Sequence, residues 1–373
     1  MRHRVAVLGG GIGARHLDGY LALGDRYAVT RVCDRDAGLA RELAARAGAA
    51  ACENVAAVLA DPSVEIVDVC LPPDLHLPVA RDALAAGKHV ICEKPIADSV
   101  AGADRLAEAA RAAGRQVFPV FQYRYGRAFD ALAALARAGL LGAPRAGSLE
   151  THWNRDAAYY AVPWRGTWAG EIGGAVVSHA IHIHDLIARA FGPVTEVSAM
   201  LATSINPVET EDCAALSLRT AAGALVTSSI TLGAADDTSR LRLIYEHTTV
   251  ESGREPYAPA QAPWTFTARD PARQAEIDAI VSRHPDTGRD AAQGFAGYLA
   301  AVADALDGRP DHRAVTLADG QASIELAAAI YHSDRTGRRV RLPLDRGLPI
   351  CRGWQPRQAE VRTRRAGRGL ART

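Results

Sequence analysis

Residues 4–14 read RVAVLGGGIGA, a short apolar run followed directly by a glycine-rich turn. The turn fits the pattern G-x-G-x-x-G/A, with Gly9, Gly11 and Ala14 in the three fingerprint positions. A pyrophosphate needs this arrangement because it lies against backbone N–H groups at the start of a helix, where Cβ atoms would block its approach. The stretch therefore predicts a strand, a dinucleotide-binding turn and a helix, in that order.

The sequence that follows the turn supports this interpretation. A second strand is expected at residues 28–33 and ends at Asp34, whose carboxylate can accept hydrogen bonds from both hydroxyls of a ribose. The same carboxylate would repel a 2′-phosphate, so Asp34 favours NAD. Arg35 beside it can pair with a phosphate, so NADP stays open. A purely structural glycine turn is the alternative.

The first third of the chain alternates between apolar strands and alanine-rich helices. Strands that are apolar on both faces and alternate with helices indicate βαβ units and a parallel sheet covered on both sides. We therefore expect a doubly wound α/β domain over residues 1–122. Its later strands are expected at 64–71, 89–92 and 116–120, and its later helices at 36–47, 78–86 and 99–113.

Beyond residue 143 the pattern changes to longer strands that are rich in Thr, Ser and Val and partly alternate apolar with polar residues. Such alternation is typical of an antiparallel or mixed sheet with one buried face. We expect a second domain over 123–350 and a basic, poorly ordered tail over 351–373. The strands are expected at 145–153, 195–205, 213–220, 223–232 and 240–250, and two closing helices at 289–307 and 319–335.

The composition excludes several classes of partner. A net charge of +1 gives no field that would favour nucleic acid or an anionic membrane over a small ligand. The six cysteines are scattered singly, so neither a zinc ribbon nor a disulfide framework is indicated. Without an apolar, uncharged window of ~18 residues or a signal-like start, we expect a cytoplasmic protein with no membrane partner.

Lysine is rare in this chain: of 43 Lys and Arg residues, only Lys88 and Lys94 are lysines. Lys94 follows an expected strand end in HVICEKP, residues 89–95, at the sheet edge where α/β proteins bind ligands. A guanidinium stays protonated and cannot exchange a proton, whereas an amine can when desolvation and a nearby cation lower its pKa. Lys94 is therefore predicted to be an acid–base group, and a surface salt bridge with Glu93 is the alternative.

Residues 178–185 read SHAIHIHD and lie in an apolar stretch that predicts a helix over 175–191. Ser178, His182 and Asp185 are spaced i, i+4 and i+7 and share one stripe of that helix. A polar stripe on a buried helix must face a cleft or buried partners, so we expect His182 to transfer a proton or to bind a substrate hydroxyl. A buried structural network, or a metal site formed by His179, His182 and Asp185, is the alternative.

Aromatic and arginine residues gather just before that helix. Aromatic faces combined with guanidinium groups suit a polar ring substrate, including one that carries a carboxylate or a phosphate. An ordered loop at the domain interface is the alternative. The residues are Arg155, Tyr159, Tyr160, Trp164, Arg165 and Trp168.

Taken together, these motifs resemble the Gfo/Idh/MocA family of NAD(P)-dependent oxidoreductases, over residues 3–345. The resemblance rests on the glycine fingerprint, on Glu-Lys-Pro at 93–95, on V-x-x-P-x-x-x-H at 69–76, and on Gly-Gly at 173–174 leading to H-x-x-D at 182–185. It implies a Rossmann domain followed by an α+β domain with a large open, mostly antiparallel sheet. It also implies a homodimer or homotetramer built through that sheet, and sugars, polyols or their derivatives as substrates.

By position, the resemblance makes Lys94 the catalytic lysine and His182 the catalytic histidine. Many family members carry Asp or Asn four residues before that histidine, where this chain has Ser178, which cannot serve as a carboxylate in a proton relay. The expected cofactor-binding residues are Gly9, Gly11, Ile12, Gly13, Ala14, Asp34, Arg35, Leu71, Pro72, His76, Glu93, Lys94 and Gln122. The expected substrate-binding residues are Arg124, Arg155, Tyr159, Trp164, Arg165, Ser178, His179 and His182.

The function we expect is hydride transfer between a nicotinamide and a secondary alcohol or ketone of a sugar-like molecule, with Lys94 or His182 exchanging the hydroxyl proton. One alternative is a lyase or glycosidase that uses NAD only transiently and makes no net redox change. Another is a non-catalytic regulator that responds to NAD.

Overall fold

Six parallel strands form the first sheet in the order β3-β2-β1-β4-β5-β6. We describe a computed structural model, and the structure covers residues 2–283 and 293–356. The chain crosses from β1 outward in both directions, which confirms the expected doubly wound domain and leaves a crevice at the carboxyl ends of β1 and β4. The strands are β1 (His3–Leu8), β2 (Tyr27–Cys33), β3 (Ala50–Cys52), β4 (Ile66–Val69), β5 (His89–Cys92) and β6 (Val117–Pro119). The helices are α1 (Gly13–Ala22), α2 (Ala37–Ala47), α3 (Val55–Ala60), α4 (His76–Ala85) and α5 (Val100–Ala113).

The second sheet has the order β13-β12-β11-β7-β10-β9-β8-β14, and its neighbouring strands are antiparallel except for the parallel pair β7 and β10. Its strands alternate buried and exposed residues, as in β9, because helices cover one face only. The mostly antiparallel sheet is thus confirmed, although the strand expected at 240–250 is two strands joined by a turn. The strands are β7 (Pro144–Asn154), β8 (Val194–Ala202), β9 (Cys213–Thr220), β10 (Leu225–Thr231), β11 (Gly233–Tyr245), β12 (Thr248–Glu251), β13 (Thr265–Ala268) and β14 (Val340–Arg341).

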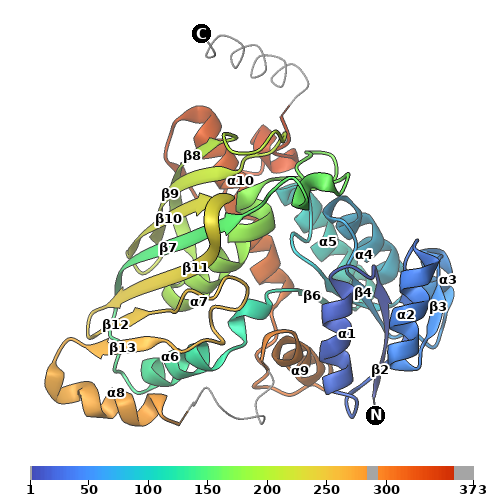
Figure 1. Cartoon of the computed structure of the whole chain (residues 1–373), viewed down its shortest axis with the longest axis horizontal. Coiled ribbons are helices and arrows are strands. Elements are labelled where there is room, and N and C mark those ends of the chain that lie inside the picture. Colours follow the sequence, from blue (N-terminus) through green and yellow to red (C-terminus); the bar gives the residue numbers. More distant parts are fainter. Residues whose placement is uncertain (1, 284–292, 357–373) are drawn as a thin grey trace, which may run out of the picture.

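Two late helices tie the domains together. Helix α9 (Gly294–Leu306) packs on α1, where a Cβ at Gly19 would lie 2.9 Å from Leu299. Helix α10 (Leu317–Thr336) contacts both α5 of the first domain and β8 of the second (Figure 1). The remaining helices are α6 (Arg127–Arg137), α7 (Ile181–Phe191) and α8 (Gln274–Val281), and single 3₁₀ turns lie at Pro73–Leu75, Gln122–Arg124, Tyr159–Ala161, Pro271–Arg273 and Pro349–Arg352.

The structure corrects two expectations from the sequence, and a third lies partly outside the residues that it describes. The helix expected at 175–191 is not α-helical throughout, because Val176–Ala180 form a π-helix that runs into α7. The expected tail is ordered at its start, since Trp354 is fully buried and its indole donates to the carbonyl of Ile172 at 2.7 Å. Residues 357–373 of that tail, and residues 289–292 of the helix expected at 289–307, lie outside the described residues.

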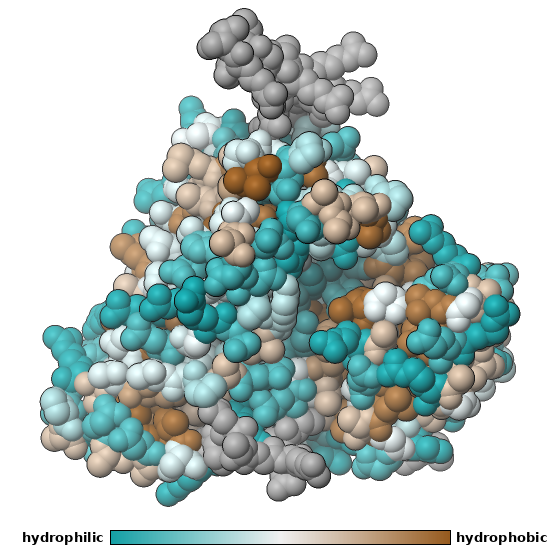
Figure 2. Space-filling model, viewed as in Figure 1, coloured by the Kyte–Doolittle hydropathy of each residue, from teal (hydrophilic) through white to brown (hydrophobic). Residues whose placement is uncertain are grey.

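Within the described residues, no helix is long and apolar enough to cross a membrane. The face of the molecule seen in Figure 2 is mostly hydrophilic, and its hydrophobic residues lie in small groups.

Candidate active site

A cleft of about 1630 Å³ runs from the carboxyl ends of β1 and β4 to the second domain. Pockets for one small ligand usually measure ~300–1,000 Å³, so this cleft has room for a dinucleotide and a second molecule. It is lined by residues of both expected sites, namely Gly9, Gly11, Ile12, Asp34, Arg35, Leu71, Pro72, His76, Glu93, Lys94, Gln122, Tyr159, Trp164, Arg165, Ser178 and His182.

The glycine-rich turn has the backbone geometry that a pyrophosphate requires. Gly9 has a φ of +95°, and a Cβ there would lie 2.4 Å from the carbonyl oxygen of Cys70, so only glycine fits. A Cβ at Gly11 would meet no atom within 4 Å, which leaves the space beside that backbone open. Asp34 accepts a hydrogen bond from the backbone N–H of Gly10 at 2.6 Å, so the carboxylate lies against the turn. Arg35 is exposed and lines the cleft.

Lys94 follows β5 and points into the cleft between the two domains. Its ammonium donates to the carbonyl oxygen of Ser178 at 2.8 Å, and its backbone N–H donates to the carboxylate of Glu93 at 3.0 Å. Burial lowers the pKa of Lys94, although the negative charges of Glu93 and Glu171 act in the opposite direction. A lowered pKa makes the amine available as a proton acceptor nearer to neutral pH.

His182 lies on α7 and stacks on the ring of Tyr123, with 4.4 Å between the ring centroids. Its side chain is buried, and within the described part of the chain its Nδ1 has no hydrogen-bond partner. Burial and the charge of Lys94 hold the pKa of His182 well below its usual value, so the imidazole is neutral. His182 also lines the cleft, so its neutral imidazole can hydrogen-bond a ligand hydroxyl there.

Glu171 does not line the cleft but is a neighbour of Ser178 and Lys94, and it was not among the residues expected from the sequence. The residue is 3% exposed, and its carboxylate accepts a hydrogen bond from the backbone N–H of Gly166 at 2.5 Å. Burial raises the pKa of Glu171, while a hydrogen bond from Ser178 and the charge of Lys94 act to lower it. The structure thus brings a carboxylate next to Ser178 and Lys94. A lone acidic residue in the apolar, glycine-rich stretch 166–177 was the available signal.

An arginine stacked on aromatic rings lines the second-domain side of the cleft. The guanidinium of Arg165 lies 4.0 Å from the ring centroid of Tyr159 and 4.5 Å from that of Trp164, and it donates to the Tyr159 hydroxyl. Among the residues that the structure describes, no carboxylate forms an ion pair with Arg165. Its charge acts on the carboxyl of Glu171, whose pKa it lowers, and can also act on an anionic group in the cleft.

Several expected site residues are directed elsewhere. Arg124 does not line the cleft, because its buried guanidinium forms two hydrogen bonds of 2.6 and 2.7 Å with Asp185. That pairing turns Asp185 away from the metal site considered with His179 and His182. Arg155 pairs with Asp237 at 3.1 Å and donates to His179 at 3.3 Å, so neither Arg155 nor His179 lines the cleft. Gly13 and Ala14 support the turn from behind, where Gly13 packs against Val7 and Cys70.

Comparison with known proteins identifies the family. Residues 3–121 match the model described as "Oxidoreductase family, NAD-binding Rossmann fold", and residues 129–251 match the "GFO/IDH/MocA C-terminal domain". The two matches follow one another and together cover more than half of the chain. The chain belongs to the Gfo/Idh/MocA oxidoreductase family, and its first domain is the NAD-binding domain of that family.

Individual relatives are more distant. An uncharacterized oxidoreductase of Synechocystis sp. is 32% identical over 57% of this chain and 61% of its own length. The chain therefore matches about three fifths of that curated relative. The WlbA dehydrogenase of Chromobactrium violaceum, solved with NADH and UDP-GlcNAcA, has a TM-score of 0.81 and is 28% identical over 92% of this chain and 97% of its own. The WlbA dehydrogenase of Bordetella pertussis was solved with the same two ligands and has a TM-score of 0.79. It is 27% identical over 92% of this chain and 99% of its own.

Proposed function

We propose that the protein is an NAD-dependent dehydrogenase that acts on a secondary alcohol, or the corresponding ketone, of a sugar-derived substrate. One observation carries the proposal: the phosphate-binding turn, Asp34, Lys94 and His182 line a single cleft. Bound NAD would accept or supply the hydride. The turn would hold its pyrophosphate, and Asp34 would accept hydrogen bonds from the adenosine ribose.

Lys94 is the group that we expect to exchange the substrate's hydroxyl proton. Its hydrogen bond to the Ser178 carbonyl fixes the position of the amine, and burial lowers its pKa toward the range of a general base. The neutral imidazole of His182, which lines the same cleft, would hydrogen-bond the same hydroxyl or its neighbour. The nearby carboxylate of Glu171 supports the ammonium form once the proton has been transferred.

The substrate side of the cleft favours a sugar with an anionic group. Arg165 is held over the rings of Tyr159 and Trp164 where it lines the cleft. A carboxylate or phosphate would pair with its guanidinium, while a sugar ring would pack on the aromatic faces. The two WlbA structures, which hold a sugar nucleotide with a carboxylate in the same fold, support this choice.

A substrate screen tests the proposal. Sugars, polyols and UDP-sugars with and without a carboxylate would be incubated with NAD, and with NADH for the matching ketones, while absorbance at ~340 nm is followed. We expect turnover with a carboxylated sugar, and a loss of ~10²–10⁴-fold in kcat for Lys94→Met with NADH affinity retained. Unchanged kcat in Lys94→Met would refute the role of the lysine. Product formation without net absorbance change would indicate transient oxidation instead.

A further inference from the structure

The carbonyl group that accepts the Lys94 ammonium belongs to the start of the helix that carries His182. It is the carbonyl of Ser178, in the π-helix Val176–Ala180, and its oxygen lies 2.8 Å from the Lys94 nitrogen. The backbone N–H of Ser178 in turn donates to the carbonyl of Gly174 at 2.8 Å. Gly174 is therefore one hydrogen bond away from the residue that anchors the Lys94 side chain.

Glu211, which lies just before β9, fixes the backbone around Gly174. One oxygen of its carboxylate accepts the backbone N–H groups of Gly174 and Val176 at 3.0 and 3.1 Å. The hydroxyl of Tyr331, on α10, donates to the same oxygen at 2.9 Å. Glu211 is 4% exposed, so water does not compete for these contacts. A continuous series of hydrogen bonds thus leads from Glu211 through Gly174 and Ser178 to Lys94.

The backbone just before Gly174 is strained and is held by a second contact. Ile172 is buried and has a φ of +56°, a conformation that a β-branched residue rarely adopts. The indole of Trp354 donates to the Ile172 carbonyl at 2.7 Å, and its ring stacks on Tyr331 with 5.8 Å between the centroids. Strain of this kind persists only where surrounding contacts fix the backbone, and both strained residues and short π-helices are common at functional sites.

We propose that Glu211 is a positioning residue that holds the Ser178 carbonyl where it anchors the Lys94 amine. Glu211 does not line the cleft, so it acts through the backbone of Gly174 and Ser178. Without its carboxylate, two backbone N–H groups lose their acceptor, and the Ser178 carbonyl is free to move away from Lys94. A displacement of ~1 Å of a reacting group is enough to lower a rate by ~10²-fold. The inference rests on the proposed acid–base role of Lys94.

The two lysines of the sequence make a direct test possible. Protein labelled with ¹³C at lysine Cε gives signals from Lys88 and Lys94 alone, and Lys94→Arg assigns them. A methylene held in one rotamer has two separate proton signals, whereas rapid exchange among rotamers averages them. We expect the two Lys94 signals to merge in Glu211→Leu and to stay separate in Glu211→Gln, which keeps an accepting oxygen. Lys88, whose ammonium donates to the carbonyls of Asp61 and Val64, should be unchanged in both variants.

A matched control separates positioning from a general loss of stability. Asp212 is the next residue and is 0% exposed, and its carboxylate accepts three backbone N–H groups of residues 204–206. Asp212→Leu should therefore lower the midpoint of urea unfolding, as Glu211→Leu does. It should leave the two Lys94 signals separate, because residues 204–206 are not part of the hydrogen-bonded series that reaches Lys94.

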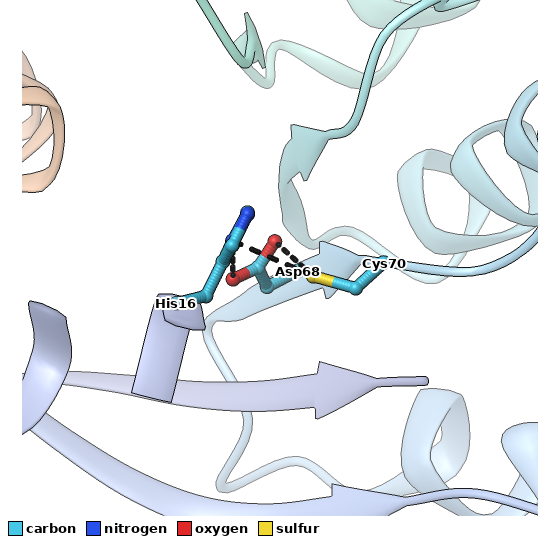
Figure 3. A group of neighbouring side chains, drawn as sticks. All are labelled: His16, Asp68 and Cys70. Atoms are coloured by element: carbon cyan, nitrogen blue, oxygen red, sulfur yellow. Dashed lines mark hydrogen bonds and ion pairs between the residues drawn. The ribbon is translucent and has the colours of Figure 1, made fainter. Parts of the chain in front are cut away.

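A second control comes from the first domain. Another buried polar cluster lies beside the glycine-rich turn and consists of His16, Asp68 and Cys70 (Figure 3). Its Asp68 accepts the hydroxyl of Tyr20 at 2.8 Å, much as Glu211 accepts that of Tyr331. Tyr20→Phe and Tyr331→Phe thus each remove one hydroxyl donor from a buried carboxylate. We expect Tyr331→Phe to narrow the separation of the Lys94 signals and Tyr20→Phe to leave it unchanged.

Several results would overturn the proposal. One is a wild type whose Lys94 signals already coincide, and another is a folded Glu211→Leu variant whose signals stay separate. Merged signals in Asp212→Leu or Tyr20→Phe would also overturn it, because the effect would then not belong to the Glu211 contacts. If Glu211→Leu does not fold, Tyr331→Phe decides, and an unchanged separation in that variant overturns the proposal.

A kinetic measurement tests the consequence for catalysis. With a substrate from the screen, Glu211→Leu should lower kcat by ~10²-fold while NADH affinity is unchanged, and Glu211→Gln should restore most of the activity. Equal kcat in Glu211→Leu and the wild type would overturn the proposal.

The Lys94 spectra need neither cofactor nor substrate. Their failure would leave the proposed dehydrogenase function standing, whereas a protein that bound no NADH would refute that function without altering the Lys94 signals.

Discussion

At the residue scale, the cleft is lined by side chains that short sequence motifs identify, and it is supported by others whose partners lie far along the chain. That the glycine turn, Asp34, Lys94 and His182 line one cleft could be predicted, because each stands in a short motif at the end of a strand or on a buried helix. The contacts of His16 could not, since its partners Asp68 and Glu93 are 52 and 77 residues away. Arg124 was predicted at the substrate, but a pairing across 61 residues with Asp185 holds it elsewhere.

Asp34 should determine the choice between the two nicotinamide cofactors. Replacing Asp34 with Ser removes a charge that accepts hydrogen bonds from the ribose and repels a 2′-phosphate, while a hydroxyl remains that can accept from Gly10. We expect NADH affinity to fall by ~10–100-fold, the range for hydrogen bonds to a charged group. NADPH affinity should not fall, because Arg35 stays available to its phosphate. Fluorescence titration with both cofactors measures this, and equal losses for NADH and NADPH would contradict the role of Asp34.

At the scale of elements, the hydrophobic periodicity of the sequence predicts most strands and helices. The helix that carries His182 shows where this periodicity no longer predicts the backbone conformation. Its apolar pattern predicted one α-helix over 175–191, whereas Val176–Ala180 are π-helical. Tertiary contacts at the helix start are the physical reason that we find. Glu211 accepts the backbone N–H groups of Gly174 and Val176 at 3.0 and 3.1 Å, and a Cβ on Gly174 would lie 1.9 Å from the Glu211 carbonyl oxygen. No local pattern contains that contact.

The Glu211 carboxyl should make the stability of this region depend on pH. Burial raises its pKa from 4.5 to about 7, so folding favours the protonated form. The contribution of Glu211 to the free energy of unfolding is complete below pH 4.5 and is lost as the pH rises through 7. The free energy of unfolding should fall by about 3 kcal/mol in total over this interval. Glu211→Gln cannot ionise and should lack this loss. Urea unfolding of both proteins at pH ~5 and ~8.5 measures it, and parallel pH dependences would contradict the assignment.

At the scale of the whole molecule, two domains were predictable from the change in strand pattern, but their connection was not. Helix α9 returns from the end of the chain to pack on α1, and α10 contacts both domains. Gly19 of α1 and Leu299 of α9, which face each other, are 280 residues apart in the sequence (299 − 19). Composition and periodicity do not reveal contacts between segments so far apart. Together the helices join the NAD-binding domain to the domain of the mostly antiparallel sheet, and the cleft lies between the two.

The open face of the second sheet is predicted to form the contact between subunits of a homo-oligomer. Met200, Ala215 and Ser229 lie side by side across β8, β9 and β10 and point outward, and Met200 is 72% exposed. Met200→Glu would place a charge in that contact and should reduce the mass in solution to the 39.5 kDa of one chain. Leu21 is an exposed residue of α1 in the first domain, so Leu21→Glu should leave the mass unchanged. Light scattering after gel filtration measures both, and a wild type that is already monomeric would contradict the prediction.

The most direct test of the account as a whole is equilibrium binding of NADH and of NADPH to the wild-type protein, followed by nicotinamide fluorescence. The open backbone at Gly11 and the carboxylate of Asp34 against the turn predict that NADH binds at least ~10-fold more tightly than NADPH. Tighter binding of NADPH would mean that Arg35 outweighs Asp34. If neither cofactor binds, the cleft does not hold a dinucleotide and the proposed hydride transfer is contradicted.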